Sequence, residues 1–306
     1  MPHELQEWLP RHEILTYEET LRLMRIAAEL GVSKVRITGG EPLTRRGMVD
    51  FIRRVPEIPG IRSIGLSTNG TLLAKEIALG KTTAEALREA GVQSMNISLD
   101  TLDAAVYAQI TGRDFHARVL GGIDAAIAAG FDQLKLNAVL MRGRNEDQLL
   151  PLIEFAAERN LLLRFIELMP VSTTEVLNQN NFMSVMEAKR LIESAYESLI
   201  PETKFRTNGP ATYYQIPGRA QRIGFIGAMT NTHFCENCNK LRLTCDGKLR
   251  PCLGSYLEFD IMGPLRAGAS DEQLKQFFVN VVERKPREHD FRNNYQPNRK
   301  MIAIGG

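Results

Sequence analysis

Short apolar runs alternate with helical patterns over the first 170 residues of the chain. The apolar runs, which we interpret as strands, cover residues 34–38, 63–68, 94–99, 133–140 and 162–168. Segments with apolar positions at helical spacing flank them, at residues 17–30, 48–55, 83–90, 117–129 and 146–158. Strands without a polar face that alternate with helices predict a parallel sheet covered by helices. The pattern fits an open doubly wound sheet or a (β/α) barrel, complete or partial.

Local signals predict where several of these helices begin and end. Thr16 and Glu19 fit a capping box at the start of the helix over residues 17–30. Gly31, Gly91 and Gly130 each follow a helical segment, where a left-handed residue closes the last turn at little cost.

The alternation ends after Pro170. A polar stretch with Asn178, Asn180 and Asn181 follows, then a helical pattern over 185–198 and short β-like runs. We therefore place a domain boundary near residue 171. Residues 1–170 are expected to form a (β/α) unit, and residues 171–306 a smaller C-terminal α+β region.

Polar residues and glycines directly follow four of the predicted strands, at positions 39–42, 67–70, 98–100 and 167–170. Ligands of parallel α/β folds bind at the carboxyl ends of the strands, so these loops predict one binding site. Within it, Glu41 either holds an amine of a ligand or lies on the surface of a strand-to-helix turn.

Six cations lie on or beside the predicted strands and in a later hairpin: Lys34, Arg36, Lys135, Arg164, Lys240 and Arg242. Cations that face a buried cavity need an anion, and a triphosphate accepts several charge-assisted hydrogen bonds at once. An internal salt bridge or a solvated strand end explains any single one of them equally well. A P-loop and a GxGxxG fingerprint after a strand are both absent from the sequence.

The overall charge is nearly balanced, with 38 Lys and Arg against 36 Asp and Glu and a net charge of +2. It gives no reason to expect nucleic acid or a membrane surface as a partner. No apolar run approaches the roughly 20 residues that cross a bilayer. We expect a soluble, cytoplasmic protein.

All four cysteines lie within 18 residues, and the first 234 residues contain none. Such clustering in an intracellular chain favours metal ligation over disulfides. Asp246 and Gly247 suit a two-residue hairpin turn, which would pair Cys245 with Lys248 and place Cys252 opposite Leu241. Cys245 would then lie at the far tip, about 13 Å from Leu241.

Three thiolates thus remain for one site: Cys235, Cys238 and Cys252. Three interpretations of this cysteine site remain open. A structural zinc ion would need a fourth ligand such as His233. An iron–sulfur cluster held by three thiolates leaves one iron open for a substrate. The thiols could also be unligated.

The loops and the cysteine hairpin together form an ordered set of motifs, at residues 8–11, 34–42, 67–70, 96–100, 110–113, 135–137, 139–143, 164–169, 235–252 and 305–306. This set resembles the GTP 3′,8-cyclase family, molybdenum cofactor biosynthesis protein A, among the radical S-adenosylmethionine (SAM) enzymes. The resemblance covers nearly the whole chain. It implies an incomplete (β/α) TIM-type barrel and two [4Fe–4S] clusters, of which the first cleaves SAM and the second binds GTP. The resulting radical removes a ribose hydrogen from GTP, and the ribose carbon then bonds to C8 of the purine.

The resemblance also implies roles for individual residues. For SAM these are Gly40, Ser98 and Met169. For GTP they are Arg36, Ser67, Lys135, Arg164, Lys240, Leu241 and Arg242. For the second [4Fe–4S] cluster they are Cys235, Cys238 and Cys252, while Cys245 matches no family ligand. The terminal Gly305 and Gly306 would reach into the active site. The implied pathway partner is a cyclic pyranopterin monophosphate synthase, and the resemblance is compatible with a homodimer.

The sequence departs from the family pattern at its start. The family's CxxxCxxC motif ends in Cys-Met-Pro, and this chain begins at Met1 and Pro2. The first strand, three cluster ligands and an arginine for GTP are therefore missing, so we expect no cyclase activity from this chain as given. Three explanations fit this departure: a start codon assigned too far downstream, a deliberate fragment, or a degenerate protein. We favour the misassigned start, because an internal Cys-Met-Pro supplies a Met at the right place. Smaller departures are Lys240 for arginine, Ser67 for threonine and a longer stretch over residues 71–84.

Two other functions remain as alternatives. One is a non-catalytic, GTP-binding regulatory protein with a single cluster. The other is a zinc-ribbon module that grips nucleic acid, which the near-neutral charge disfavours.

Overall fold

The computed structural model describes residues 9–77, 80–171, 180–207, 209–236, 238–293, 295 and 297–304. Its main feature is an eight-stranded sheet with the order β1-β2-β5-β6-β7-β10-β9-β8. The strands are β1 (Lys34–Ile37), β2 (Ser63–Thr68), β5 (Ser94–Ser98), β6 (Gln133–Leu140), β7 (Leu162–Glu167), β10 (Arg222–Ile226), β9 (Thr212–Gln215) and β8 (Ile200–Pro201). The first six run parallel, β9 pairs antiparallel with β10, and β8 pairs antiparallel with β9. All five predicted strands are confirmed, to within a residue at their ends.

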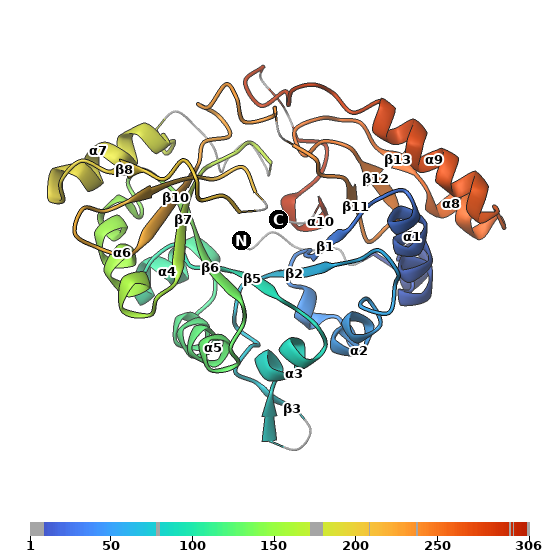
Figure 1. The fold of residues 1–306 in the computed structure, drawn as a ribbon, viewed down its shortest axis with the longest axis horizontal. Helices are drawn as coiled ribbons and strands as arrows, with labels where there is room; N and C mark the ends of the chain where they lie inside the picture. The colour runs from blue at the N-terminus through green and yellow to red at the C-terminus, as the bar shows by residue number, and fades with distance from the viewer. Residues whose placement is uncertain are drawn as a thin grey trace.

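The sheet curves into an open arc with helices along its outer side (Figure 1). These helices are α2 (Met48–Arg53), α3 (Thr83–Glu89), α4 (Ala104–Thr111), α5 (His116–Ala128), α6 (Leu149–Glu158) and α7 (Val185–Ala195), and the short turns η2 (Pro42–Thr44) and η4 (Glu146–Gln148) precede α2 and α6. The main core lies between sheet and helices and includes Leu66, Met95, Leu136, Leu163 and Phe165. Helices on one side of a curved, unclosed sheet confirm the incomplete barrel.

The predicted helix signals are confirmed. Thr16 and Glu19 form both hydrogen bonds of a capping box at the start of α1 (Tyr17–Glu29), which follows the turn η1 (Arg11–Glu13). Gly31, Gly91 and Gly130 all have positive φ angles.

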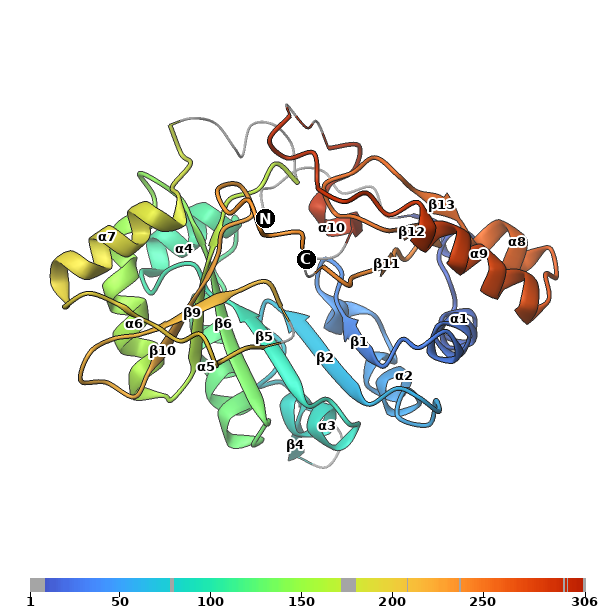
Figure 2. The same cartoon turned by 45° about the horizontal axis from the view of Figure 1, so that its top comes forward.

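A second layer lies on the open side of the arc (Figure 2). It contains the three-stranded sheet β11 (Arg242–Leu243), β12 (Lys248–Arg250) and β13 (Phe259–Asp260), with α8 (Met262–Arg266), α9 (Asp271–Glu283) and α10 (Met301–Ile304). Leu23 and Ile26 of α1 share a core with Leu249, Leu274 and Phe278. Since β8, β9 and β10 belong to the large sheet, residues after 171 contribute to both layers, and the domain division at that position stays a prediction.

The hairpin register differs from the predicted one. Arg242 pairs with Arg250 and Leu243 with Leu249, and the Thr244 amide donates to the Lys248 carbonyl at 2.9 Å. The loop therefore has three residues, Cys245 to Gly247, and only Gly247 is left-handed, with a φ of 68°. A type I turn closed by one left-handed glycine is the usual three-residue solution. The predicted pairings of Cys245 with Lys248 and of Cys252 with Leu241 are wrong by one residue.

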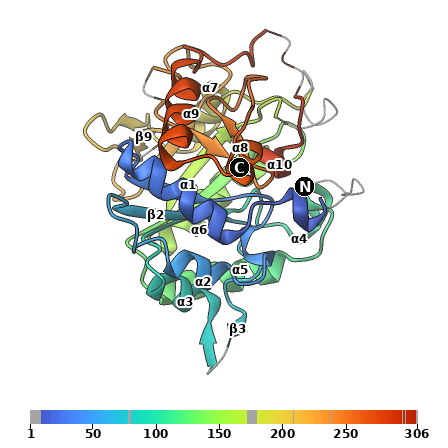
Figure 3. The ribbon, with the colours of Figure 1, turned by 90° about the vertical axis from the view of Figure 1, so that its right-hand side faces the viewer.

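The stretch over residues 71–84 forms a small ribbon of β3 (Glu76–Ile77) and β4 (Lys81–Thr82). This ribbon extends away from the body of the molecule (Figure 3). Among the described residues, no helix has the length and apolar character needed to cross a membrane.

Candidate active site

The face of the sheet turned away from the helices carries polar side chains. In β5, the half-buried or exposed Ser94, Asn96 and Ser98 alternate with the buried Met95 and Ile97. The same alternation places Arg36, Ser67, Lys135 and Arg164 on this face. The inner side of the arc is therefore a polar surface backed by an apolar core.

Arg36 lies across the neighbouring strand β2. Its guanidinium donates to the Leu66 carbonyl at 3.1 Å and to the Ser94 hydroxyl at 3.2 Å. It occupies the space above Gly65, where a Cβ atom would come within 2.7 Å of the guanidinium carbon. Burial, and then the charge of Arg164, lowers the pKa of Arg36 to about 10. The side chain is nevertheless exposed to solvent, as expected for a cation on the inner face of an unclosed sheet.

Arg164 and Lys135 lie deeper, with 6% and 4% of their surface exposed. Two nitrogens of Arg164 donate to the amide oxygen of Asn137, at 2.9 and 2.6 Å, which fixes the plane of the guanidinium. The Lys135 amine donates to Gln133 at 2.7 Å. Burial, followed by the charges of Arg164 and Arg36, lowers the pKa of Lys135 to about 8. Among the described residues, neither cation has an ion pair with a carboxylate.

Through Lys240 and Arg242, the cysteine hairpin contributes to the same group of cations as Arg36 and Arg164. Lys240 is exposed to solvent, yet the protein atoms around its amine and then the charge of Arg242 lower its pKa to about 8, with smaller effects from Arg164 and Arg36. Burial lowers the pKa of Arg242, and the nearby thiols of Cys238 and Cys252 partly offset this lowering. The structure therefore groups five of the six predicted cations, and Lys34 lies exposed at the start of β1.

The three predicted cluster ligands are neighbours. Burial raises the pKa of the Cys252 thiol, a hydrogen bond from the Gly254 backbone and then the charge of Lys285 lower it, and Cys235 and Cys238 raise it. Cys245 lies apart from them at the hairpin tip, beside Asp246 and Arg45. Within the part of the chain that the structure describes, no three His, Cys, Asp or Glu side chains converge closely enough for a single metal ion.

The three residues that the resemblance assigns to SAM lie at the carboxyl ends of strands. Gly40 and Ser98 are exposed, and Met169 packs on a small apolar cluster with Val171 and Phe291. By contrast, Arg36, Lys135 and Arg164 are the third residues of their strands. The predicted site at the strand ends is thus only part of the polar surface, because the cations lie further down the inner face.

The Glu41 carboxylate is held by hydrogen bonds within the protein. Its carboxylate accepts hydrogen bonds from the Asn69 amide at 2.7 Å, the Thr68 hydroxyl at 2.9 Å and the Leu43 amide at 3.1 Å. It therefore joins the loops after β1 and β2 and is more than a surface residue of a turn. Burial raises its pKa, and these hydrogen bonds oppose that rise.

Leu241 is half-buried, and its side chain packs on the core below the hairpin. The Ser67 hydroxyl accepts a hydrogen bond from Asn96 at 3.4 Å, while the amide oxygen of Asn96 is buried with no partner among the described residues. Gly305 and Gly306 lie outside the described residues.

Two glycines on the inner face were not predicted as site residues. Gly65 accommodates Arg36, and Gly224 in β10 accommodates Arg164 and Tyr213, which would lie 2.9 and 2.7 Å from a Cβ atom there. A glycine inside a predicted strand signals such a close approach, so the signal was present at Gly65, which lies in the strand predicted over residues 63–68.

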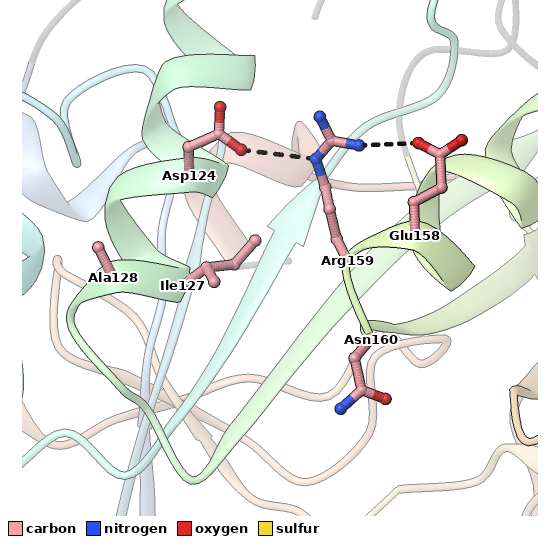
Figure 4. Close-up of a pocket in the computed structure, with 6 residues that line it drawn as sticks. All are labelled: Asp124, Ile127, Ala128, Glu158, Arg159 and Asn160. Carbon is pink, nitrogen blue, oxygen red and sulfur yellow. Dashed lines mark hydrogen bonds and ion pairs between the residues drawn. The ribbon is translucent and has the colours of Figure 1, made fainter.

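A surface hollow on the helical side is separate from this site. Arg159 lies there between Asp124 at 3.5 Å and Glu158 at 3.4 Å (Figure 4). Its other lining residues are Ile127, Ala128 and Asn160, and none of the six is a predicted site residue.

Comparisons with known proteins agree with these features. Residues 3–156 match the Radical SAM superfamily, and residues 161–291 match Molybdenum Cofactor Synthesis C. The GTP 3′,8-cyclase of Moorella thermoacetica is 44% identical over 97% of this chain and 90% of its own length. That of Thermodesulfovibrio yellowstonii is 42% identical over 100% of this chain and 92% of its own length.

Among solved structures, Streptococcus suis SuiB bound to its precursor peptide SuiA aligns with a TM-score of 0.60. The alignment covers 96% of this chain and 70% of that one at 17% identity, so it shows a shared fold. Relatives that are more than 40% identical over nearly their whole length show that the chain shares their family as well as their fold. The chain belongs to the GTP 3′,8-cyclase family of radical SAM enzymes.

Proposed function

We propose that this protein binds GTP on the inner face of its sheet for conversion to (8S)-3′,8-cyclo-7,8-dihydroguanosine 5′-triphosphate in molybdopterin cofactor biosynthesis. The observation that carries the proposal is the group of cations that joins the sheet to the cysteine hairpin. Arg36, Lys135 and Lys240 all have lowered pKa values because burial and neighbouring positive charges disfavour their protonated forms. A polyanion would relieve this repulsion, and a triphosphate has the charge and the acceptors to do so.

The geometry suggests how each group would act. Arg164, held in plane by Asn137, is oriented to bind phosphate oxygens, and Arg36 and Lys135 lie beside it. Lys240 and Arg242 would hold the nucleotide from the hairpin side, with Leu241 contributing its backbone because its side chain is in the core. Ser67 lies between these groups as a hydroxyl donor. Fixing the substrate from both sides would hold it in register for reaction.

Three neighbouring thiols with cations beside them have the donor chemistry of a [4Fe–4S] site. Such a cluster is wider than a single ion, so its ligands need not converge on one point. Cys235, Cys238 and Cys252 would hold it and leave one iron open towards the base of GTP. Gly40, Ser98 and Met169 would bind SAM at the strand ends. When bound together with a reduced cluster, SAM supplies the organic radical on which the family's chemistry depends.

The 306 residues contain no cysteine before Cys235. We propose that this polypeptide by itself binds GTP and one cluster without generating the radical. The alternative function, a non-catalytic GTP-binding protein with one cluster, rests on this same observation. In the catalytic case, the product would pass to a cyclic pyranopterin monophosphate synthase.

The test compares the chain with a form extended by the N-terminal segment of the Moorella relative. Both are reconstituted anaerobically, and iron, sulfide, GTP binding and GTP-dependent 5′-deoxyadenosine are measured. We expect one cluster and no 5′-deoxyadenosine from the short form, and two clusters and turnover from the long form. GTP binding without turnover in both forms would favour the regulatory protein.

A matched pair of variants tests the nucleotide site in the same experiment. Arg164→Met should weaken GTP binding by about tenfold or more, because a charge-assisted hydrogen bond is lost. Arg113→Met, an exposed arginine outside the cation group, should leave binding unchanged. Equal affinities for the two variants, or bound zinc in place of iron and sulfide, would overturn the proposal.

A further inference from the structure

Lys285 follows α9 and reaches the segment that carries the cysteines. Its amine donates to the carbonyl of Lys240 at 2.8 Å and to that of Pro251 at 2.5 Å. It also lies 3.7 Å from the sulfur of Cys238. Lys240 is two residues after Cys238, and Pro251 directly precedes Cys252. One amine therefore bridges the two segments that bear the thiols.

The three contacts match the three N–H groups of an ammonium ion, and none of them is to a carboxylate. Across the residues described, Lys285 forms no ion pair with Asp or Glu. Lys275, within α9 itself, differs in this respect, because its amine lies 2.6 Å from Glu29. A positive charge held against a thiol, without a carboxylate, indicates that its counter-charge is the sulfur ligand set.

The helix holds this amine in place. Leu274, Phe278 and Val281 are buried between α1 and the hairpin, in the same core as Leu249. The Lys285 amide donates to the Val282 carbonyl at 3.0 Å, which continues the end of the helix. The position of the amine relative to the cysteines is thus set by packed elements on both sides.

We infer that Lys285 is a positioning residue for the cysteine site, fixing the spacing of Cys238 and Cys252 and supplying a positive charge to their thiolates. The inference rests on the proposed function, since it concerns the cluster proposed there. Three thiolates around a dicationic core leave a net negative charge. The potential of a cluster depends on net charge and on hydrogen bonds to its sulfurs, so both properties of Lys285 should affect it.

The test uses the full chain with Lys285→Met, Lys285→Gln and Lys285→Arg, and Lys275→Met in α9 as the control. After anaerobic reconstitution and a chelator challenge, iron and sulfide per chain and the midpoint potential of the cluster are measured. We expect Lys285→Met to retain the cluster about tenfold less well, as is usual when a residue that supports ligands is lost. Lys285→Gln should keep part of the cluster at a lower midpoint potential, and Lys285→Arg and Lys275→Met should match the parent.

Unchanged iron retention and midpoint potential in Lys285→Met and Lys285→Gln would overturn the inference. So would an equal loss in Lys285→Arg accompanied by a lower unfolding temperature, which would indicate a packing role alone. If the parent chain itself takes up no iron and sulfide, the proposed cluster is wrong and the inference falls with it. These results are distinct, so failure of the inference can be told from failure of the proposed function.

Discussion

At the residue scale, glycines decide where the inner-face arginines lie. Gly65 and Arg36 are register partners on adjacent strands, and the guanidinium folds back over the glycine. Gly224 and Arg164 repeat this relation on the other side of the sheet, between β10 and β7. The absence of a side chain at each position leaves room for a large cation next to the backbone.

Gly65→Ala tests this role. The new methyl group would displace the far end of a flexible side chain, so the stability cost should be about 1 kcal/mol, at the low end for an added methyl group. GTP affinity should fall by about tenfold, because Arg36 can no longer take its position. Gly121→Ala in α5, where a Cβ atom meets nothing within 4 Å, is the control and should leave GTP affinity unchanged. Calorimetric titration and thermal unfolding of both variants measure the effects, and equal affinities would show that Arg36 has no contact with GTP.

At the element scale, the cysteine hairpin is tied to the chain's C-terminal segment. Arg299 donates to Asp246 in the hairpin loop at 2.8 Å and lies 2.5 Å from Glu258. Glu258 also pairs at 2.6 Å with Arg250, which is fully buried. Two cations and two carboxylates thus connect β12 with the approach to α10.

Arg299→Met should loosen this connection. It leaves two partly buried carboxylates short of a partner, and we expect a loss of about 1 to 3 kcal/mol in the free energy of unfolding. Hydrogen exchange should become faster in residues 242–250 and 297–304. Arg53→Met removes an exposed pair with Asp50 on α2 and should change stability by less than about 0.5 kcal/mol. Unaltered exchange in both segments would show that the apolar contacts of α10 suffice to hold it.

At the scale of the whole molecule, the near-neutral net charge conceals a local excess of positive charge. The net charge is +2, yet five cations are grouped near the inner face of the sheet, and the burial of Lys135 and Arg164 opposes the stability of the free protein. A site that gains binding energy from buried charges loses folding energy before the ligand arrives.

Lys135→Met should separate the effect of a buried charge on folding stability from its effect on GTP binding. At pH 7 it should stabilise the free protein by about 1 to 4 kcal/mol, since a buried cation is removed, and weaken GTP binding at the same time. The pKa of Lys135 is about 8 in the folded state, against an ordinary value of 10.5 for a lysine in an unfolded chain. The unfolded chain therefore binds more protons between these values, and parent stability should rise with pH there.

GTP affinity of the parent should fall over the same interval, as the amine loses its charge. Urea unfolding and GTP titration at pH 7 and at higher pH measure both trends. Lys81→Met, which removes a surface lysine 2.7 Å from Glu89, is the control. A variant less stable than the parent at pH 7 would contradict this account.

The sequence by itself determined the five strands of the first 170 residues and the helices that flank them, because periodicity and caps such as Thr16 with Glu19 depend on residues close together in the chain. It also indicated the separation of Cys245 from the other cysteines, since any tight hairpin turn near Asp246 leaves Cys245 at the tip. The family followed from motifs of fixed spacing. These are local properties, and the structure and the comparisons agree with them.

Only the tertiary structure decided which residues meet. The hairpin register depended on Gly247 packing against Met262, where a Cβ atom would lie 2.4 Å from the Met262 Cβ. Periodicity places Arg36 and Arg164 on a face, but the curvature of the sheet brings their charges together. Lys285 lies 47 residues from Cys238, and their contact depends on how α9 packs against the hairpin. Such contacts arise from the packing of distant segments, which no local pattern in the chain encodes.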